Sequence, residues 1–355
     1  MTTSSEPGPA DSLGRSSAGE SGETPWHAIV RRILMLALSA VGLYYALPLL
    51  TEALAQFPQV SKVGIGWLVV VVAFESASFV MVWMMLRISL GTRRWFPVAT
   101  AQLAGNALSS VVPAGAAAGA ALQFRMMAES GIDTTTAASG MTAFALLQFG
   151  TIGVLPLLTL PALLGGGAVS AGLRRALLVG VIVFIAVAAL SLVVAVFDRP
   201  LRAVGALIEK MANLFRRKKQ PLADLPARLI EERDRIKEAL GERWRDALLV
   251  SGARVGFDYL ALVAAVGAVG ARVRPSLLLV AYISAVVLAL IPLTPGGLGF
   301  VEAGLAATLT LAGVDGAHAV LATLIYRLAE YWLPLLAGPV AYVVFRVARR
   351  RARPA

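Results

Sequence analysis

The chain has 355 residues, of which 58% are hydrophobic and 15% are charged, and its formal net charge is +11. A mean hydropathy of +0.76 excludes an ordinary water-soluble domain. The basic residues gather at the ends of apolar runs, without the interleaved aromatics of a nucleic-acid surface, so we expect them to set membrane orientation and expect no nucleic-acid partner.

The amino-terminal 25 residues are rich in Ser, Gly, Thr and Pro and contain almost no large apolar groups. Such a segment cannot bury enough apolar surface to offset the entropy of ordering, so residues 1–25 are predicted to be a disordered cytoplasmic tail. The apolar run that follows is too long for the core of a signal peptide and is interpreted as a retained first span. We assign residues 26–346 to a membrane domain and 347–355 to a basic cytoplasmic tail.

Six apolar runs are long enough to cross the ~30 Å hydrocarbon core of a bilayer as helices. Because the runs are unbroken, they exclude a transmembrane β-barrel, whose strands would alternate apolar and polar residues. The predicted spans cover residues 29–50, 63–86, 137–164, 173–197, 247–270 and 317–345.

Two further apolar stretches are interrupted by proline and glycine. Residues 97–130 are broken at 112–115 (VPAG), and residues 276–312 are broken at 291–297 (IPLTPGG). Proline removes a helical hydrogen-bond donor, so each stretch is predicted to form two half-helices that are too short to cross alone. The predicted fold is an all-α polytopic membrane protein with six full transmembrane helices and two re-entrant, broken-helix hairpins, or about eight hydrophobic segments.

The distribution of basic residues supports this topology. If both broken stretches return to the side they entered from, 25 of the 32 Lys and Arg residues face the cytoplasm. If the first stretch crossed fully, the loop 198–246 with its 13 basic residues would lie outside. Two basic residues lie within spans, and five would face outside: Lys62, Arg174, Arg175, Arg272 and Arg274.

The loop 198–246 contains a basic run at 216–219 (RRKK), followed by a helical pattern of apolar residues. We expect an amphipathic helix on the inner leaflet, with the basic run either binding anionic headgroups or serving only to fix topology. The residues that share the apolar side are Leu225, Leu229, Ile236, Leu240 and Trp244.

The two predicted hairpins enter the membrane from opposite sides, as in the inverted repeats of many secondary transporters. The second half of each hairpin begins just after a break, where unpaired amides and the positive helix end favour an anion. Asn106, Ser109 and Ser110 recur at helical spacing and would turn a polar face toward the first break. As an alternative, Gly115 and Gly119 could serve only close helix packing.

Six charged residues fall within apolar segments, and each needs a partner or a wet cavity. Arg254 and Asp258 are spaced to neutralise each other, whereas Glu75 is either a proton-coupling residue or a partner of Arg254. The six are Glu75, Arg254, Asp258, Glu302, Arg327 and Glu330. Arg327 is the expected partner of Glu302 and is also spaced to pair with Glu330.

The segment 294–305 (TPGGLGFVEAGL) and the last span resemble the lysylphosphatidylglycerol synthase transmembrane-region family, whose members are flippase-like. The first hairpin is similar to the family through Asn106, Pro113 and Gly115. Where many members have Gly-Glu and then Arg, this chain has Ala116 to Ala118, which leaves the lipid substrate open. The positions that match the second family motif are Pro295, Gly296, Gly297, Gly299, Glu302, Arg327 and Trp332.

The resemblance implies a transporter that moves an anionic or aminoacylated phospholipid, or a polyprenyl-phosphate-linked lipid, across the bacterial cytoplasmic membrane. The breaks at Pro113 and Pro295 would hold the phosphate, and Glu302 with Arg327 would bind the headgroup or gate. Gating or coupling roles would fall to Glu75, Arg254, Asp258 and Glu330.

Two other classes of function remain open. An intramembrane enzyme acting on lipid-linked substrates would need a nucleophile and base, yet the chain has no cysteine and only two histidines, His27 and His318. We therefore expect no enzyme and no metal or other cofactor. The other class is a non-transporting membrane protein that binds a lipid synthase or glycosyltransferase through the basic run 216–219. The family's aminoacyl-transferase domain is not expected after Arg346.

Overall fold

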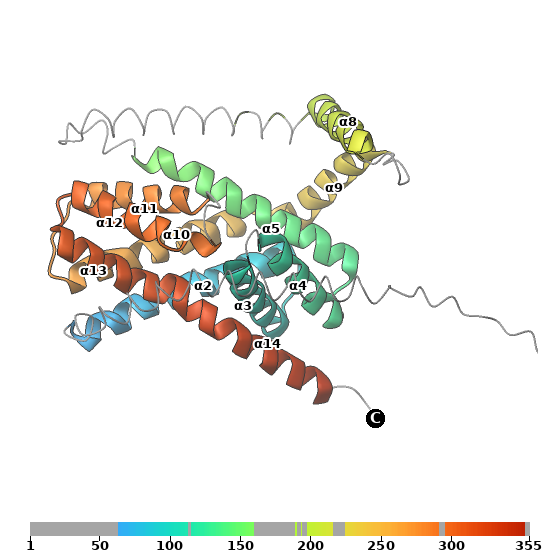
Figure 1. Cartoon of the computed structure of the whole chain (residues 1–355). Coiled ribbons are helices and arrows are strands. Elements are labelled where there is room, and N and C mark those ends of the chain that lie inside the picture. The colour runs from blue at the N-terminus through green and yellow to red at the C-terminus, as the bar shows by residue number, and fades with distance from the viewer. Residues whose placement is uncertain are drawn as a thin grey trace, which may run out of the picture.

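The structure is a computed structural model, and every element that it describes is helical (Figure 1). The described residues are 63–112, 115–159, 189, 193, 197–215, 224–290 and 295–351. Several predictions fall outside this part of the chain: the tail 1–25, the span 29–50, nearly all of the span 173–197, the basic run 216–219 and Pro113.

Within the described residues, four helices are long and apolar enough to cross a membrane. They are α2 (Ile65–Ser89), α5 (Thr134–Val154), α10 (Trp244–Ala268) and the continuous helix Gly316–Arg351. Each overlaps one predicted span, so the chain is a multi-pass helical membrane protein. The α-helical part of the predicted span 137–164 ends at Val154, where α5 passes into a 3-10 turn, Leu155–Thr159. This turn contains a proline, which lacks the backbone donor that an α-helix needs.

The helix Gly316–Arg351 consists of α13 (Gly316–Arg327), a π-helical turn (Leu328–Trp332) and α14 (Leu333–Arg351). It begins at the cap residue Asp315, whose side chain accepts a hydrogen bond from the amide of Ala317 at 3.1 Å. Backbone hydrogen bonds lower the pKa of this exposed carboxyl, so its capping contribution is present above the unfolded-state pKa and is lost as the pH falls.

The first interrupted stretch forms two helices, α3 (Trp95–Val111) and α4 (Ala116–Glu129), that lie side by side (Figure 1). Gly105 and Gly119 meet at their contact, where a Cβ atom on Gly105 would lie only 2.8 Å from the carbonyl oxygen of Gly119. Small residues allow this close approach of two backbones. The stretch therefore forms a pair of packed helices, the first ending at Val111 and the second beginning at Ala116.

The second interrupted stretch also forms two helices in contact, α11 (Pro275–Ala289) and α12 (Phe300–Leu311). The short turn Pro295–Gly297 precedes α12. Gly296, Gly297 and Gly299 have φ values of 62°, 71° and 78°. Only glycine adopts this left-handed conformation without strain, so the glycines of the motif are what allow this turn.

In the loop, α8 (Asp198–Phe215) and α9 (Leu225–Leu240) pack as a pair, with Arg233 bound to Asp198 at 2.7 Å. The predicted amphipathic helix extended too far at its carboxyl end. A 3-10 turn follows α9, and Trp244 belongs to the next helix, α10. The sequence reading also missed α8 as an amphipathic helix. Its exposed apolar side chains are Val204, Leu207, Ile208 and Met211.

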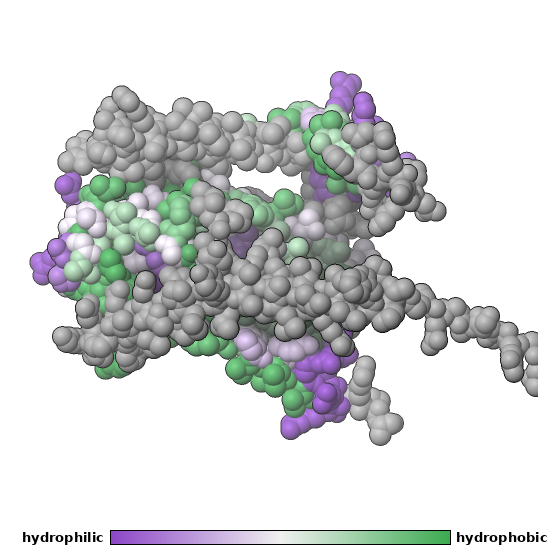
Figure 2. Space-filling view, in the orientation of Figure 1, coloured by the Kyte–Doolittle hydropathy of each residue, from purple (hydrophilic) through white to green (hydrophobic). Residues whose placement is uncertain are grey.

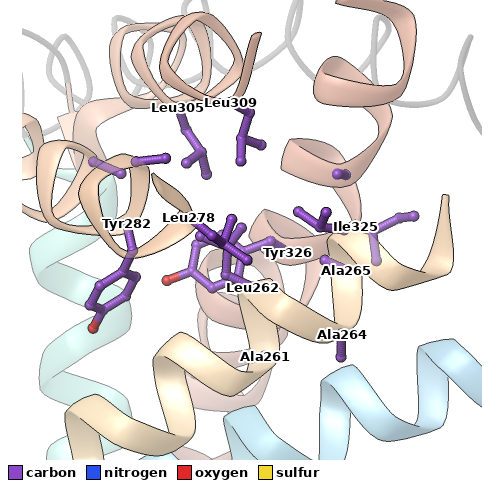
Figure 3. Close-up of a cluster of buried hydrophobic side chains, with 14 of the residues drawn as sticks. Ala261, Leu262, Ala264, Ala265, Leu278, Tyr282, Leu305, Leu309, Ile325 and Tyr326 are labelled. Atoms are coloured by element: carbon purple, nitrogen blue, oxygen red, sulfur yellow. The ribbon is translucent and has the colours of Figure 1, made fainter. Parts of the chain in front are cut away.

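The larger hydrophobic core lies among α2, α10, α11, α12 and α13, and Figure 3 shows Leu262, Leu305 and Ile325 within it. A second cluster joins α2, α3 and α4 to Phe345 of α14. The continuous helix Gly316–Arg351, formed by α13, the π-helical turn and α14, therefore runs from one half of the molecule to the other (Figure 1). In Figure 2 the visible face over α11 to α13 is mostly apolar, and hydrophilic residues gather at the far ends of α8 and α14.

Candidate functional site

Arg327 is the last residue of α13, is only 4% exposed, and joins three segments of the chain. Its Nε donates to Glu302 of α12 at 2.7 Å, and its Nη1 donates to Glu330 at 2.6 Å. Its Nη2 donates to the carbonyl oxygen of Gly296, in the turn before α12, at 3.3 Å. One buried guanidinium therefore binds two carboxylates and the backbone of the second break.

The neighbours of this guanidinium lie in the π-helical turn. Glu330 and Tyr331 follow Arg327 by three and four residues, so both lie on the Arg327 side of the helix. The Tyr331 ring centroid is 4.6 Å from the guanidinium carbon, a cation–π contact, and Trp332 packs edge-on against that ring.

The two breaks meet at Tyr331. Its hydroxyl donates to the carbonyl oxygen of Ser110, near the end of α3, at 3.3 Å. On the other side it lies so close to Gly296 that any side chain at that position would overlap the ring. Segments far apart in the sequence thus converge on one tyrosine beside Arg327.

The contact at Tyr331 gives a stability prediction. Tyr331→Phe keeps the ring over Arg327 but removes the hydroxyl bond to Ser110, so unfolding should become easier by only about 0.5–1.5 kcal/mol. Tyr331→Ala also removes the ring and should cost about 3–5 kcal/mol. Thermal unfolding of the detergent-purified variants measures both. Equal losses for the two variants would contradict the dominant role assigned to the ring.

A second polar cluster surrounds Asp258 of α10, which is 6% exposed. The hydroxyl of Tyr282 donates to Asp258 Oδ2 at 2.9 Å, and the hydroxyl of Tyr326 donates to Oδ1 at 2.5 Å. The ion pair between Arg254 and Asp258 that their spacing suggested is not formed, although both residues are described. The half-buried Arg254 instead has an Nε without a hydrogen-bond partner.

Glu75 of α2 is 3% exposed and interacts electrostatically with residues of both clusters. Its carboxyl interacts electrostatically with Asp258, Glu330 and Arg254. Its Oε2 atom has no hydrogen-bond partner. From the sequence, Glu75 was predicted to be either a proton-coupling residue or a partner of Arg254. In the structure it interacts with two carboxyls, those of Asp258 and Glu330, and with one cation, Arg254.

The other predicted site residues lie in the first hairpin. Ser109 packs against Gly119, and the hydroxyl of Ser110 donates to the carbonyl oxygen of Asn106 in its own helix at 3.0 Å. A side chain on Gly115 would overlap the carbonyl oxygens before it. These residues build the hairpin, and only the Ser110 carbonyl reaches Tyr331.

The helices after the breaks begin at Gly115 and Gly299, and neither start has a side-chain cap. Amides in a first helical turn are available to an anion, and the helix dipole favours negative charge there. At α12 that place is shared with Glu302, whose Oε2 has no hydrogen-bond partner. The site can therefore offer amides and a guanidinium to a phosphate, and a carboxylate oxygen to an ammonium group.

The three tyrosines were missed by the sequence analysis. Tyrosines in apolar spans carry a signal, since a buried hydroxyl needs a partner, but sequence spacing does not name that partner. Among the described residues there is no group of three or more Asp, Glu or His that could hold a metal ion.

One comparison with known proteins gives a match. A family model described as the lysylphosphatidylglycerol synthase TM region matches residues 32–338, which include both breaks and the Arg327 cluster. No curated protein matches the chain.

Proposed function

The chain belongs to the lysylphosphatidylglycerol synthase transmembrane-region family, and on this premise we propose that it is a flippase-like lipid transporter. Its cargo would be an anionic or aminoacylated phospholipid, or a polyprenyl-phosphate-linked lipid, moved between leaflets of a bacterial cytoplasmic membrane. The observation that supports this most is the meeting of both breaks at Tyr331 and Arg327.

In this proposal the hairpins α3–α4 and α11–α12 are re-entrant. Their helices have 17, 14, 15 and 12 residues, fewer than the ~20 needed to cross a bilayer. The distribution of basic residues then puts both termini and the loop 198–246 in the cytoplasm. Entering from opposite faces, the hairpins form an inverted pair whose breaks meet at one site.

The headgroup would bind where Arg327 now holds its two carboxylates. A lipid phosphate can take over one guanidinium bond and accept from the first amides of α12. The released carboxylate of Glu302 can then receive the ammonium of an aminoacyl headgroup. Because Arg327 also holds Gly296 and stacks on Tyr331, headgroup binding would loosen the contact between the breaks while the acyl chains stay in the bilayer.

Lipid translocation in proteoliposomes tests this proposal. The purified chain should speed the leaflet exchange of at least one labelled lipid among phosphatidylglycerol, lysyl-phosphatidylglycerol and a polyprenyl phosphate. Glu302→Gln should slow it by about tenfold or more for a lipid with an aminoacyl headgroup, since it removes the carboxylate charge that receives the ammonium group, an interaction of the strength of a charged hydrogen bond, about 1.5–3 kcal/mol. Glu129→Gln, outside the site and paired with Arg125, is the matched control and should keep the wild-type rate.

Two results would contradict the proposal. One is wild-type protein that speeds none of the labelled lipids, and the other is Glu302→Gln exchanging lipid as fast as Glu129→Gln. Mass spectrometry of the same liposomes separates transport from catalysis, because we propose that the lipid is moved without chemical change.

A further inference from the structure

Among the residues that the structure describes, the buried polar network holds more acid than base. Its carboxyls are Glu75, Asp258, Glu302 and Glu330, and its guanidiniums are those of Arg254 and Arg327, so full ionisation would leave an excess of two negative charges. Uncompensated charge within a membrane-spanning helix is costly. Each half is short of one positive charge: Arg327 is held by short ion pairs to two carboxylates, whereas Glu75 and Asp258 share only Arg254, which forms no ion pair with Asp258.

Glu75 is where an additional positive charge would bind. It lies near the middle of α2, one of the candidate spans, is 97% buried, and has an oxygen without a hydrogen-bond partner. Asp258 and Glu330 interact with it electrostatically as like charges, and Arg254 as the opposing cation. A proton bound to Glu75 would remove its charge repulsion with the neighbouring carboxylates. The protonated carboxyl could also donate a hydrogen bond, which an ionised carboxylate cannot.

The described side chains of the other helices on α2 do not supply the missing charge. Helices α3 and α5 carry no titratable side chain, and the described charged side chains of α9 are exposed or paired with Asp198. Tyr282 and Tyr326, on α11 and α13, direct their hydroxyl hydrogens at Asp258 and would oppose a metal cation there. A proton fits this arrangement better than Na⁺.

We propose that Glu75 and Asp258 form a proton-binding site whose occupancy is coupled to headgroup binding at Arg327. Two residues link the sites: Glu330 binds Arg327 and repels an ionised Glu75 electrostatically, and Tyr326, which donates to Asp258, directly precedes Arg327. With Glu75 ionised, charge repulsion weakens the binding of Glu330 to Arg327. With Glu75 protonated, Glu330 stays bound to Arg327. The coupling rests on the proposed lipid transport, whereas proton binding itself does not.

Infrared difference spectra recorded across a pH titration test the proton site without any lipid transport. The wild-type chain in lipid nanodiscs should show a titrating protonated-carboxyl band that is absent in Glu75→Gln and present in Glu129→Gln. Glu75→Asp keeps a carboxyl and should keep the band, which separates a lost proton site from a misfolded variant. A band unchanged in Glu75→Gln overturns the inference.

The coupling is tested in proteoliposomes with an imposed pH gradient. A gradient of one unit should shift the steady-state leaflet ratio of the translocated lipid by up to about tenfold in wild type and in Glu75→Asp, and not in Glu75→Gln. Translocation that ignores the pH gradient, or that follows a Na⁺ gradient, overturns the coupling. A titrating band without any wild-type translocation would sink the transport proposal and leave the proton site standing.

Discussion

Arg327→Met should lower the free energy of unfolding by about 3 kcal/mol and abolish lipid translocation. Removing one partner of a buried ion pair typically costs about 3–5 kcal/mol, because the remaining charge stays buried without compensation. The lower end applies here, since the Glu302 and Glu330 side chains retain 17% and 33% of their exposure. Denaturant or thermal unfolding of the purified protein in detergent measures the loss.

Three variants make this prediction specific. Arg125→Met breaks a pair with Glu129 in which the arginine is 72% exposed, and such surface pairs are worth about 0–1 kcal/mol. Adding Glu302→Gln to Arg327→Met should recover part of the stability, because one buried charge is removed. Arg327→Lys keeps the charge without the planar fork and should fall between wild type and Arg327→Met. Equal losses for Arg125→Met and Arg327→Met would refute the central role of Arg327.

The sequence was sufficient to predict the features that follow from the cost of placing polar groups in a membrane. An unpaired charge in a membrane-spanning helix is so costly that the few charges present must pair, which is why Arg327 could be predicted as the partner of Glu302. The two breaks followed from proline and glycine chemistry. The family resemblance, confirmed by the match over residues 32–338, rests on the same glycine-rich break.

Features that depend on tertiary contacts could not be predicted in this way. Spacing made Arg254 the natural partner of Asp258, yet two tyrosines from α11 and α13 take both of its oxygens. No residue pattern predicts the π-helical turn at 328–332, nor the contact of Tyr331 with Ser110 and Gly296. The polar spacing of Asn106, Ser109 and Ser110 predicted a face toward the break, and hairpin packing uses part of it instead.

Gly119→Val should destabilise the first hairpin by about 1–3 kcal/mol, the usual cost of forcing extra atoms into a packed contact. A side chain at Gly119 would overlap the carbonyl oxygen of Gly105 and the Ser109 hydroxyl, and a backbone carbonyl cannot rotate away. Valine is a slightly better helix former than glycine, so propensity alone predicts a small gain. A measured loss is therefore steric. Unfolding in detergent supplies the measurement.

The neighbouring Ala120→Val is the matched control, because Ala120 is exposed and its substitution should change stability by less than about 0.5 kcal/mol. The pair of variants also separates packing from lipid binding. If Gly119 serves packing, Gly119→Val moves α3 and its Ser110 carbonyl away from Tyr331, and translocation falls together with stability. A stable Gly119→Val protein with slow translocation would instead show that the start of α4 contacts the headgroup, which would make the first break a binding site in its own right.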